Sequence, residues 1–186
     1  MKFSTCFANI ITTWSALFFV NASAEELTEG QKVLLASKLL QNNIPLVLLW
    51  GGDMPPSLSN HTCWKSTKVG TAPGASFRHK VETGWLGDPS IRGLKNKVET
   101  YLTLLEESGY ATLQVETLAT TSFGALIKGN YHVVYADTWC LILRPSNPKG
   151  SKVCTVWVPA NTAAFRHTAC RSAFKAMCVS KDSTCQ

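Results

Sequence analysis

Cysteines constrain the fold of this chain more than any other feature. Six of the seven lie beyond residue 24: Cys63, Cys140, Cys154, Cys170, Cys178 and Cys185. The seventh lies within residues 1–24, which have the basic start, short apolar stretch and small-residue end of a secretory signal peptide. An even number of cysteines in an exported chain predicts three disulfide bonds rather than free thiols. We therefore expect a secreted, extracellular protein with a single domain over residues 25–186.

Composition indicates an ordered domain and argues against several classes of partner. Hydrophobic residues make up 45% of the chain and charged residues 16%, as in globular rather than disordered proteins. Beyond the leader, the longest apolar run extends from Ile44 to Trp50, too short to cross a membrane as a helix. The formal net charge of +6 comes from cations scattered along the sequence. Because they are not clustered, we expect neither a nucleic-acid nor a membrane partner.

Two local patterns bear on modification and on metals. Asn60 begins an Asn-His-Thr sequon, so we expect it to be glycosylated in a secreted protein. The cysteines form no Cys-x-x-Cys pair, and His167 with Cys170 is an isolated close His/Cys pair. That spacing does not predict a zinc site, and we expect no metal and no cofactor.

Hydrophobic patterning predicts a mostly β protein framed by two helices. Apolar residues recur at helical spacing over residues 26–41, and residues 163–178 have the composition of a second helix. Between them, period-two alternation and short turns predict about eight strands. The clearest strands are residues 46–50, 77–83, 112–117, 131–137, 139–144 and 153–158. Strands separated by short turns favour a closed antiparallel barrel or a sandwich over a parallel sheet.

Catalytic patterns are missing from the sequence. It contains no Gly-x-Ser-x-Gly, phosphate-loop or His-Glu-x-x-His motif, and its four histidines lie far apart. We therefore expect a binding protein and not an enzyme. A closed eight-stranded barrel holds a space the size of one small ligand when its own side chains leave the interior open.

The last third of the chain resembles the tick salivary lipocalins, the family of the tick histamine-binding proteins. The resemblance rests on residues 131–137, on Cys140 with the apolar strand after it, and on residues 154–158. The last of these is similar to the family's Cys-x-Leu-Trp-Val signature, with valine in place of leucine. Pro159 and the later cysteines continue the pattern in order. The resemblance implies an eight-stranded antiparallel lipocalin-like barrel with an N-terminal and a C-terminal helix.

The resemblance also implies a function. Members of this family sequester a host mediator at the bite, so it implies a small hydrophobic or amine ligand of host origin, bound by a monomer. Two alternatives to a lipid carrier stay open. One is a scavenger of a biogenic amine such as histamine or serotonin. The other is an inhibitor of host immunity or complement that binds a host protein through its exterior loops.

Alternation within the late strands predicts which residues line the barrel. Disulfides to a C-terminal helix belong outside a barrel, so Cys140 and Cys154 face outward and the odd-numbered residues of their strands face inward. We expect the ligand site to consist of Phe77, Val133, Tyr135, Leu141, Leu143, Thr155 and Trp157. Tyr135 and Thr155 would orient a hydroxyl or carbonyl group. The same alternation also turns inward Tyr131, Trp139, His79, Val81, Leu113 and Val115.

This lining predicts the chemistry of the ligand. In amine-binding relatives a carboxylate stands at each of the two positions that Leu141 and Thr155 occupy here. An amine buried without a carboxylate partner is unfavourable by several kcal/mol. Glu82 and Glu116 alternate onto polar strand faces, and Asp53 lies in a loop where it could serve a second, shallower amine site. We therefore expect a neutral or weakly acidic lipophile, a sterol or an eicosanoid, rather than histamine.

The resemblance implies a disulfide pairing that the cysteines alone leave open among several connectivities. By similarity to the family we expect Cys63–Cys185, Cys140–Cys170 and Cys154–Cys178. Peptide mapping of the secreted protein under non-reducing conditions tests these three pairs. A bond between Cys140 and Cys154, linking neighbouring strands directly, would contradict the expected set.

Overall fold

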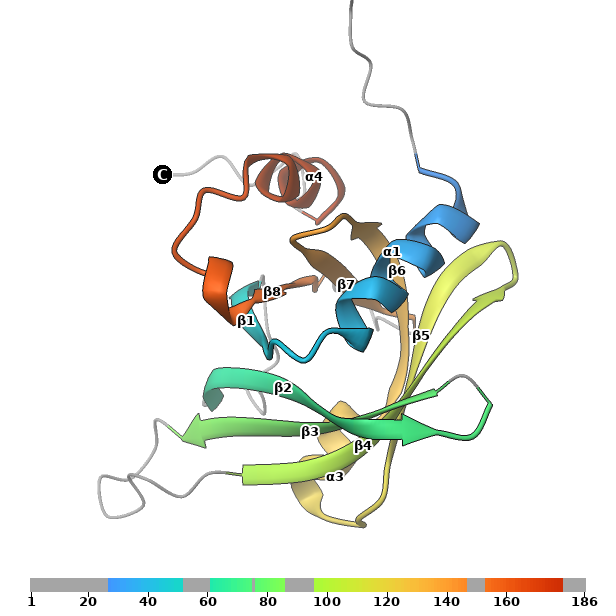
Figure 1. The fold of residues 1–186 in the computed structure, drawn as a ribbon, viewed down its shortest axis with the longest axis vertical. Helices are drawn as coiled ribbons and strands as arrows, with labels where there is room; N and C mark the ends of the chain where they lie inside the picture. The colour runs from blue at the N-terminus through green and yellow to red at the C-terminus, as the bar shows by residue number, and fades with distance from the viewer. Residues whose placement is uncertain (1–26, 52–60, 75, 86–95, 147–152, 179–186) are drawn as a thin grey trace, which may run out of the picture.

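Eight strands close into one antiparallel barrel in sequence order, and β8 pairs with β1 (Figure 1). The computed structural model describes residues 27–51, 61–74, 76–85, 96–146 and 153–178. The strands are β1 (Leu46–Gly51), β2 (His61–Ala72), β3 (Ser76–Trp85), β4 (Asn96–Glu107), β5 (Tyr110–Thr117), β6 (Gly129–Ala136), β7 (Leu141–Pro145) and β8 (Thr155–Pro159). The helical elements are α1 (Glu29–Gln41), α3 (Ser122–Ile127), the short 3-10 helix η2 (Ala160–Thr162) and α4 (Thr168–Cys178).

This architecture confirms the expected eight-stranded antiparallel barrel with an N-terminal and a C-terminal helix. None of the described helices is both long enough and apolar enough to cross a membrane. The leader over residues 1–24 and the sequon residue Asn60 lie outside the described residues, so these two expectations stay predictions.

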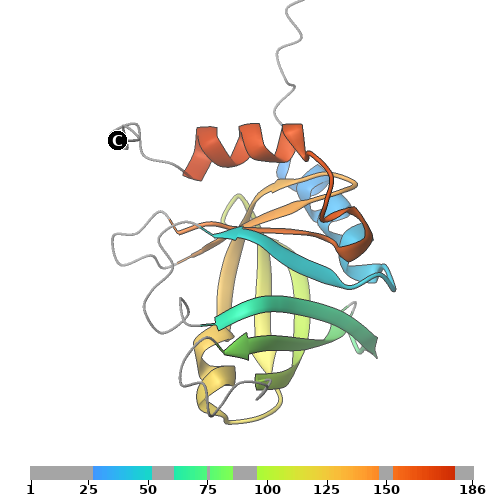
Figure 2. The same cartoon turned by 90° about the vertical axis from the view of Figure 1, so that its left-hand side faces the viewer.

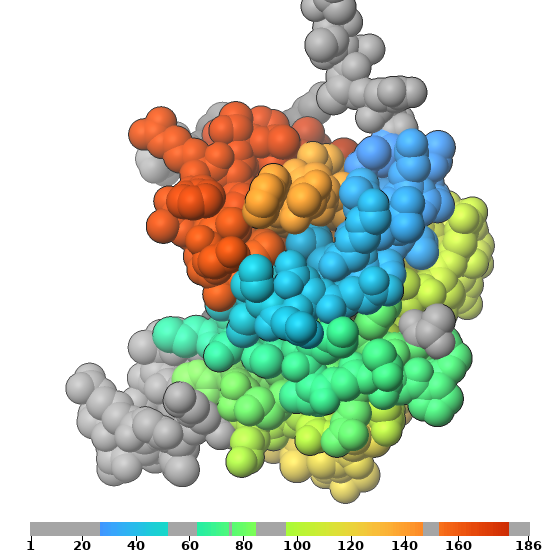
Figure 3. All heavy atoms as spheres, viewed as in Figure 1, coloured from blue at the N-terminus to red at the C-terminus, as the bar shows by residue number. Residues whose placement is uncertain are grey.

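Helix α1 lies across one end of the barrel. It begins with a capping box, in which Thr28 Oγ1 accepts from the Gln31 backbone N–H and Gln31 Oε1 accepts from the Thr28 backbone N–H. At its start, Glu29 Oε2 accepts from the Ala111 backbone N–H of β5 at 2.6 Å. At its end, the carbonyl of Gln41 accepts from Lys68 Nζ of β2 at 3.0 Å. In the space-filling view, α1 atoms fill the space between β2 and the β6–β7 hairpin (Figure 3).

Helix α3 lies at the opposite end of the molecule from α4 (Figure 2). It follows β5 and was not predicted from the sequence, because six residues are too few to show a helical period. Thr121 caps it by accepting from the Gly124 backbone N–H at 3.0 Å. A Cβ at position 124 would lie 2.9 Å from the Ala119 carbonyl oxygen, so this close turn requires glycine. Phe123 and Ile127 of α3 are buried against the barrel.

Helix α4 packs on the outside of the barrel and is bonded to it covalently. The disulfides Cys140–Cys170 and Cys154–Cys178 join the two ends of the helix to the residues directly before β7 and β8, which confirms two of the expected pairs. The third pair is not settled, because Cys63 is exposed and unbridged among the described cysteines while Cys185 lies outside them.

Three late elements begin later than predicted. The last strand was expected over residues 153–158 and starts at Thr155. The C-terminal helix starts at residue 168 and not at 163, because residues 163–167 form a turn in which His167 Nε2 donates to the Thr162 carbonyl at 2.8 Å. The strand predicted over residues 139–144 starts at Leu141. Asp137 Oδ1 accepts from the backbone N–H groups of Trp139 and Cys140 at 2.6 and 2.8 Å, which holds these residues in a turn.

The packing of α1 predicts a large cost for truncating its inward side chains. Leu40 is 2% exposed and belongs to the largest buried cluster, so Leu40→Ala should lower the free energy of unfolding by about 2–5 kcal/mol. Leu34, on the same helix, is 56% exposed, and Leu34→Ala should change it by less than about 0.5 kcal/mol. Urea titration of both variants measures the difference. Equal effects would contradict the described packing of α1.

Candidate ligand-binding site

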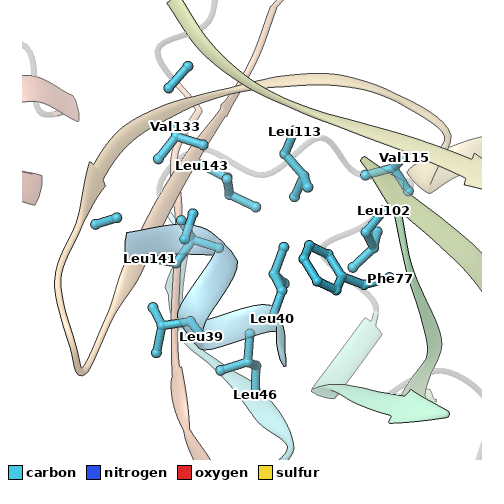
Figure 4. Close-up of a cluster of buried hydrophobic side chains, with 13 residues drawn as sticks. Leu39, Leu40, Leu46, Phe77, Leu102, Leu113, Val115, Val133, Leu141 and Leu143 are labelled. Carbon is cyan, nitrogen blue, oxygen red and sulfur yellow. The ribbon is translucent and has the colours of Figure 1, made fainter. Parts of the chain in front are cut away.

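Apolar side chains from α1 and from six strands meet in the half of the barrel that α1 closes (Figure 4). Their buried members are Ala36, Leu39, Leu40, Leu46, Phe77, Leu102, Ala111, Leu113, Val115, Val133, Ala136, Leu141 and Leu143. We call this set the inner cluster. The side chains come from both ends of the chain and from the middle, so the lining forms only when the barrel closes.

A second buried cluster occupies the half of the barrel near α3. Its buried members are Trp64, Val81, Val98, Phe123 and Ile127. Trp157 packs against both clusters and therefore lies between the two halves of the interior. Its indole Nε1 donates to Thr155 Oγ1 at 3.1 Å, which fixes the plane of the ring.

Most of the predicted lining residues face the interior. Phe77, Val133, Leu141 and Leu143 are members of the inner cluster, and Trp157 packs against it with Thr155 bonded to its indole. His79, Val81, Leu113 and Val115 are also buried. Cys140 and Cys154 belong instead to the cluster beneath α4, so the inference that they face outward is confirmed. That these residues hold a ligand stays a prediction.

Tyr135 is the predicted lining residue that the structure places elsewhere. The register between β6 and β7 shifts between Val133 and Tyr135, so that Tyr135 pairs with Ile142 and Ala136 pairs with Leu141. This bulge adds one residue to β6 and turns Tyr135 to the outer face, where it packs beneath α4. Its hydroxyl donates to Asp137 Oδ2 at 3.2 Å. The inward and outward alternation of side chains fails beyond a bulge, and nothing in the sequence of β6 indicates that a bulge is present.

Trp139 is likewise not a lining residue. It lies in the β6–β7 turn and is 54% exposed. The prediction counted it as the first residue of a strand. A strand does not form here because the Asp137 carboxylate accepts hydrogen bonds from the backbone N–H groups that would otherwise pair with a neighbouring strand.

His79 is a polar residue buried in the interior, where it links α1 to β2. His79 is 1% exposed, and its Nε2 lies 2.9 Å from the carbonyl oxygen of Leu40. Because a carbonyl can only accept, Nε2 carries the proton and Nδ1 accepts from Ser66 Oγ at 2.9 Å. Burial lowers the pKa of His79, and the charge of Lys68 adds to that effect. The ring is therefore neutral and bonds the end of α1 to β3.

Ser66 and His79 have the residue types of a nucleophile and its base, but the contacts indicate a structural pair. The second ring nitrogen is held by the Leu40 carbonyl and not by a carboxylate, and neither side chain reaches solvent. The described residues also contain no group of three or more His, Cys, Asp or Glu side chains that could hold a metal ion.

Carboxylates in the described part of the chain lie outside the apolar interior. None is among the buried residues. Three bond to cations, in the pairs Glu82–Lys80 and Glu99–Arg78 on outer strand faces and Glu116–Lys128, where Lys128 follows α3. Glu29 bonds to Lys32 and to the backbone of β5, Asp137 caps a turn, and Glu106 and Glu107 are exposed. Asp53, the expected shallow amine site, lies outside the described residues.

Comparison with known proteins decides the family. The family model for the tick histamine-binding protein matches residues 82–185, more than half of the chain. This chain belongs to the tick histamine-binding protein family. The match includes β4 to β8, both described disulfides and the late strands that carried the sequence resemblance.

A solved structure agrees with this assignment. Japanin from Rhipicephalus appendiculatus, solved with bound cholesterol, superposes on this chain with a TM-score of 0.54 at 16% sequence identity. The superposition covers 74% of this chain and 88% of the Japanin chain. At that identity the likeness shows the lipocalin-like fold and no more. No curated protein sequence matches the chain significantly.

The neutral His79 predicts that this lipocalin loses stability on acidification. Its pKa lies below 6.5 in the folded protein, so below about pH 6.5 the unfolded chain binds a proton that the folded chain does not. The free energy of unfolding is therefore unaffected by this group above that pH. It falls as the pH drops from there to the folded pKa, by at most about 1.4 kcal/mol per pH unit. Urea titrations across this range measure the slope.

A matched pair of variants tests whether His79 causes the slope of the free energy of unfolding against pH. His79→Gln should reduce it, with a remainder from His132, whose pKa is lowered by burial and by Arg144. Leu34→Gln on the exposed face of α1 is the matched control and should leave the slope unchanged, because it removes no ionisable group. An unchanged slope in His79→Gln would contradict the neutral buried ring.

Proposed function

We propose that this tick lipocalin is a secreted salivary carrier that sequesters a small neutral or weakly acidic lipophile of host origin, a sterol or an eicosanoid. Removing this mediator would suppress host inflammation or immunity. The carrier would act as a monomer. One observation carries the choice of ligand: the barrel interior is apolar, and every described carboxylate lies outside it. The leader over residues 1–24 and the two disulfides support secretion, since disulfides persist in oxidising compartments.

The free energy of burial favours a lipophile over an amine. A cation in this interior would lose its water and find no described anion, which is unfavourable by several kcal/mol or more. An apolar ligand instead gains about 25 cal/mol for each Å² that leaves water. Japanin, which shares the fold, was solved with a sterol, and this supports the same class of ligand for this chain.

Two hydroxyl groups could orient the polar end of such a ligand. Ser66 Oγ donates its proton to His79 Nδ1, so its lone pairs are left to accept from a ligand hydroxyl. Thr155 Oγ1 accepts from Trp157 and lies 3.5 Å from the Leu143 carbonyl. Thr155 keeps the orienting role predicted for it from the sequence, and Ser66 takes the role predicted for Tyr135. One such hydrogen bond adds about 0.5–1.5 kcal/mol and mainly sets orientation.

The alternative is an amine ligand, and the family's description as histamine-binding favours it. An amine would need a carboxylate from outside the described residues, such as Asp53. Native mass spectrometry of the protein secreted from eukaryotic cells reveals any copurified lipid. Calorimetric titration with cholesterol, a leukotriene, histamine and serotonin then ranks the classes. We expect lipid binding without amine binding, and submicromolar amine binding without lipid binding would overturn the proposal.

A lining variant tests where the lipophile binds. Leu143 is 8% exposed inside the barrel, so Leu143→Gln should weaken lipid binding about tenfold or more, because an amide in apolar surroundings costs roughly 1–3 kcal/mol. The matched control is Leu34→Gln on the exposed face of α1, which should bind as the natural protein does. Equal binding by both variants, each shown to be folded by urea titration, would place the ligand outside the barrel.

A further inference from the structure

A hollow of about 240 Å³ lies outside the barrel, where the β6–β7 turn meets the segment that leads into α4. Figure 2 shows these two parts of the chain side by side at one end of α4. The hollow is lined by Asp137, Trp139, Phe165 and Arg166, with Ala169 and Cys170 from α4. We call it the outer pocket. It shares no residue with the inner cluster and is therefore separate from the ligand site inside the barrel.

Two aromatic side chains of the outer pocket are unusually exposed for their size. Phe165 is 67% exposed and Trp139 is 54% exposed. Because most of their apolar area stays in water, these side chains contribute little hydrophobic free energy to folding. An exposed apolar area around a recess is typical of a surface that meets another molecule.

Both walls of the outer pocket are held in place. The Cys140–Cys170 disulfide joins the β6–β7 turn to α4 across its base. Asp137 fixes the turn through three hydrogen bonds, and His167 fixes the segment before α4 through its bond to the Thr162 carbonyl. Because these walls are already fixed, binding a partner here would cost little conformational entropy.

Basic residues lie in the wall of the outer pocket and beyond it. Arg166 is in the wall, and Arg171 and Lys175 are exposed residues farther along α4, one helical turn from each other. None of these three cations forms an ion pair with another described residue. The pocket's one carboxylate, Asp137, already accepts hydrogen bonds on both of its oxygens. The positive charge is therefore available to an acidic partner.

We propose that the outer pocket is a docking site for an acidic segment of a partner protein, which inserts one aromatic or aliphatic side chain between Trp139 and Phe165. The volume of about 240 Å³ lies below the range typical of small-molecule pockets, roughly 300–1,000 Å³, and is large enough for a single side chain. Exposed tryptophan and arginine around a recess are the residues that dominate binding energy in protein interfaces. Carboxylates that flank the inserted side chain would pair with Arg166, Arg171 and Lys175.

A peptide titration of the full mature chain, residues 25–186, tests the proposal. The probes are labelled, end-blocked peptides with a central phenylalanine, tryptophan or leucine flanked by glutamates. Matched peptides carry a central glycine or glutamine flanks. Fluorescence anisotropy should show binding that needs both the apolar centre and the acidic flanks, and that weakens as salt is raised.

Variants locate the binding. Phe165→Ala and Arg166→Glu should each weaken it about tenfold or more, the loss typical of a central interface residue. The matched controls lie on α1: Leu34→Ala removes an exposed apolar side chain, and Lys38→Glu reverses an exposed cation. Both should bind as the natural chain does. Urea titration shows whether all four variants are folded.

Three outcomes would overturn the proposal. One is the absence of peptide binding that depends on the central side chain. Another is equal loss in the α1 control variants, which would show a response to net charge alone. The third is binding to vesicles of phosphatidylcholine and phosphatidylserine that Phe165→Ala and Arg166→Glu abolish, in the absence of peptide binding, which would identify the surface as lipid-binding.

Discussion

The hydrogen bonds between β1 and β8 are the contacts on which the rest of this molecule depends. They pair Leu46 with Pro159 at one end and Gly51 with Thr155 at the other, and so join the first strand to the last. Without them the sheet would have two open edges and no inside. With them, each strand has one face toward an enclosed interior and one face toward the exterior, and every other feature of the molecule follows from that division.

The apolar run of β1 shows the consequence. Its Leu46 and Leu48 pack with the interior clusters, while Val47, Leu49 and Trp50 pack with the outer cluster beneath α4. A strand buried on both faces has no need of alternation, which is why residues 46–50 are continuously apolar. β3 differs because none of the described helices covers its outer face, and Arg78, Lys80 and Glu82 alternate there with buried residues. The same backbone geometry thus gives two sequence patterns according to what lies outside the strand.

Charge follows the same division as apolar surface. Five of the seven described carboxylates bond to cations or to hydrogen-bond donors outside the apolar interior, and the other two, Glu106 and Glu107, are exposed. The polar groups inside are neutral hydroxyls and one neutral histidine. An interior of this kind suits a molecule with little charge, whereas the basic outer pocket suits an acidic one. The two surfaces share no lining residue, so one protein could sequester a small lipophile and dock on a partner protein at the same time.

The amino-acid sequence by itself determined the class of fold, the number of strands, the two flanking helices and the outward direction of Cys140 and Cys154. These properties follow from the periodicity of apolar residues and from the family motif in the late strands. Both can be read from residues that are close together in the sequence. Tertiary structure alone decided the bulge that turns Tyr135 outward, because a register shift depends on where β7 stands beside β6. It also decided the bond of His79 to Leu40, residues 39 positions apart in the chain, and the meeting of Trp139 with Phe165. Contacts between distant segments arise only when the barrel closes, and no pattern within either segment encodes them.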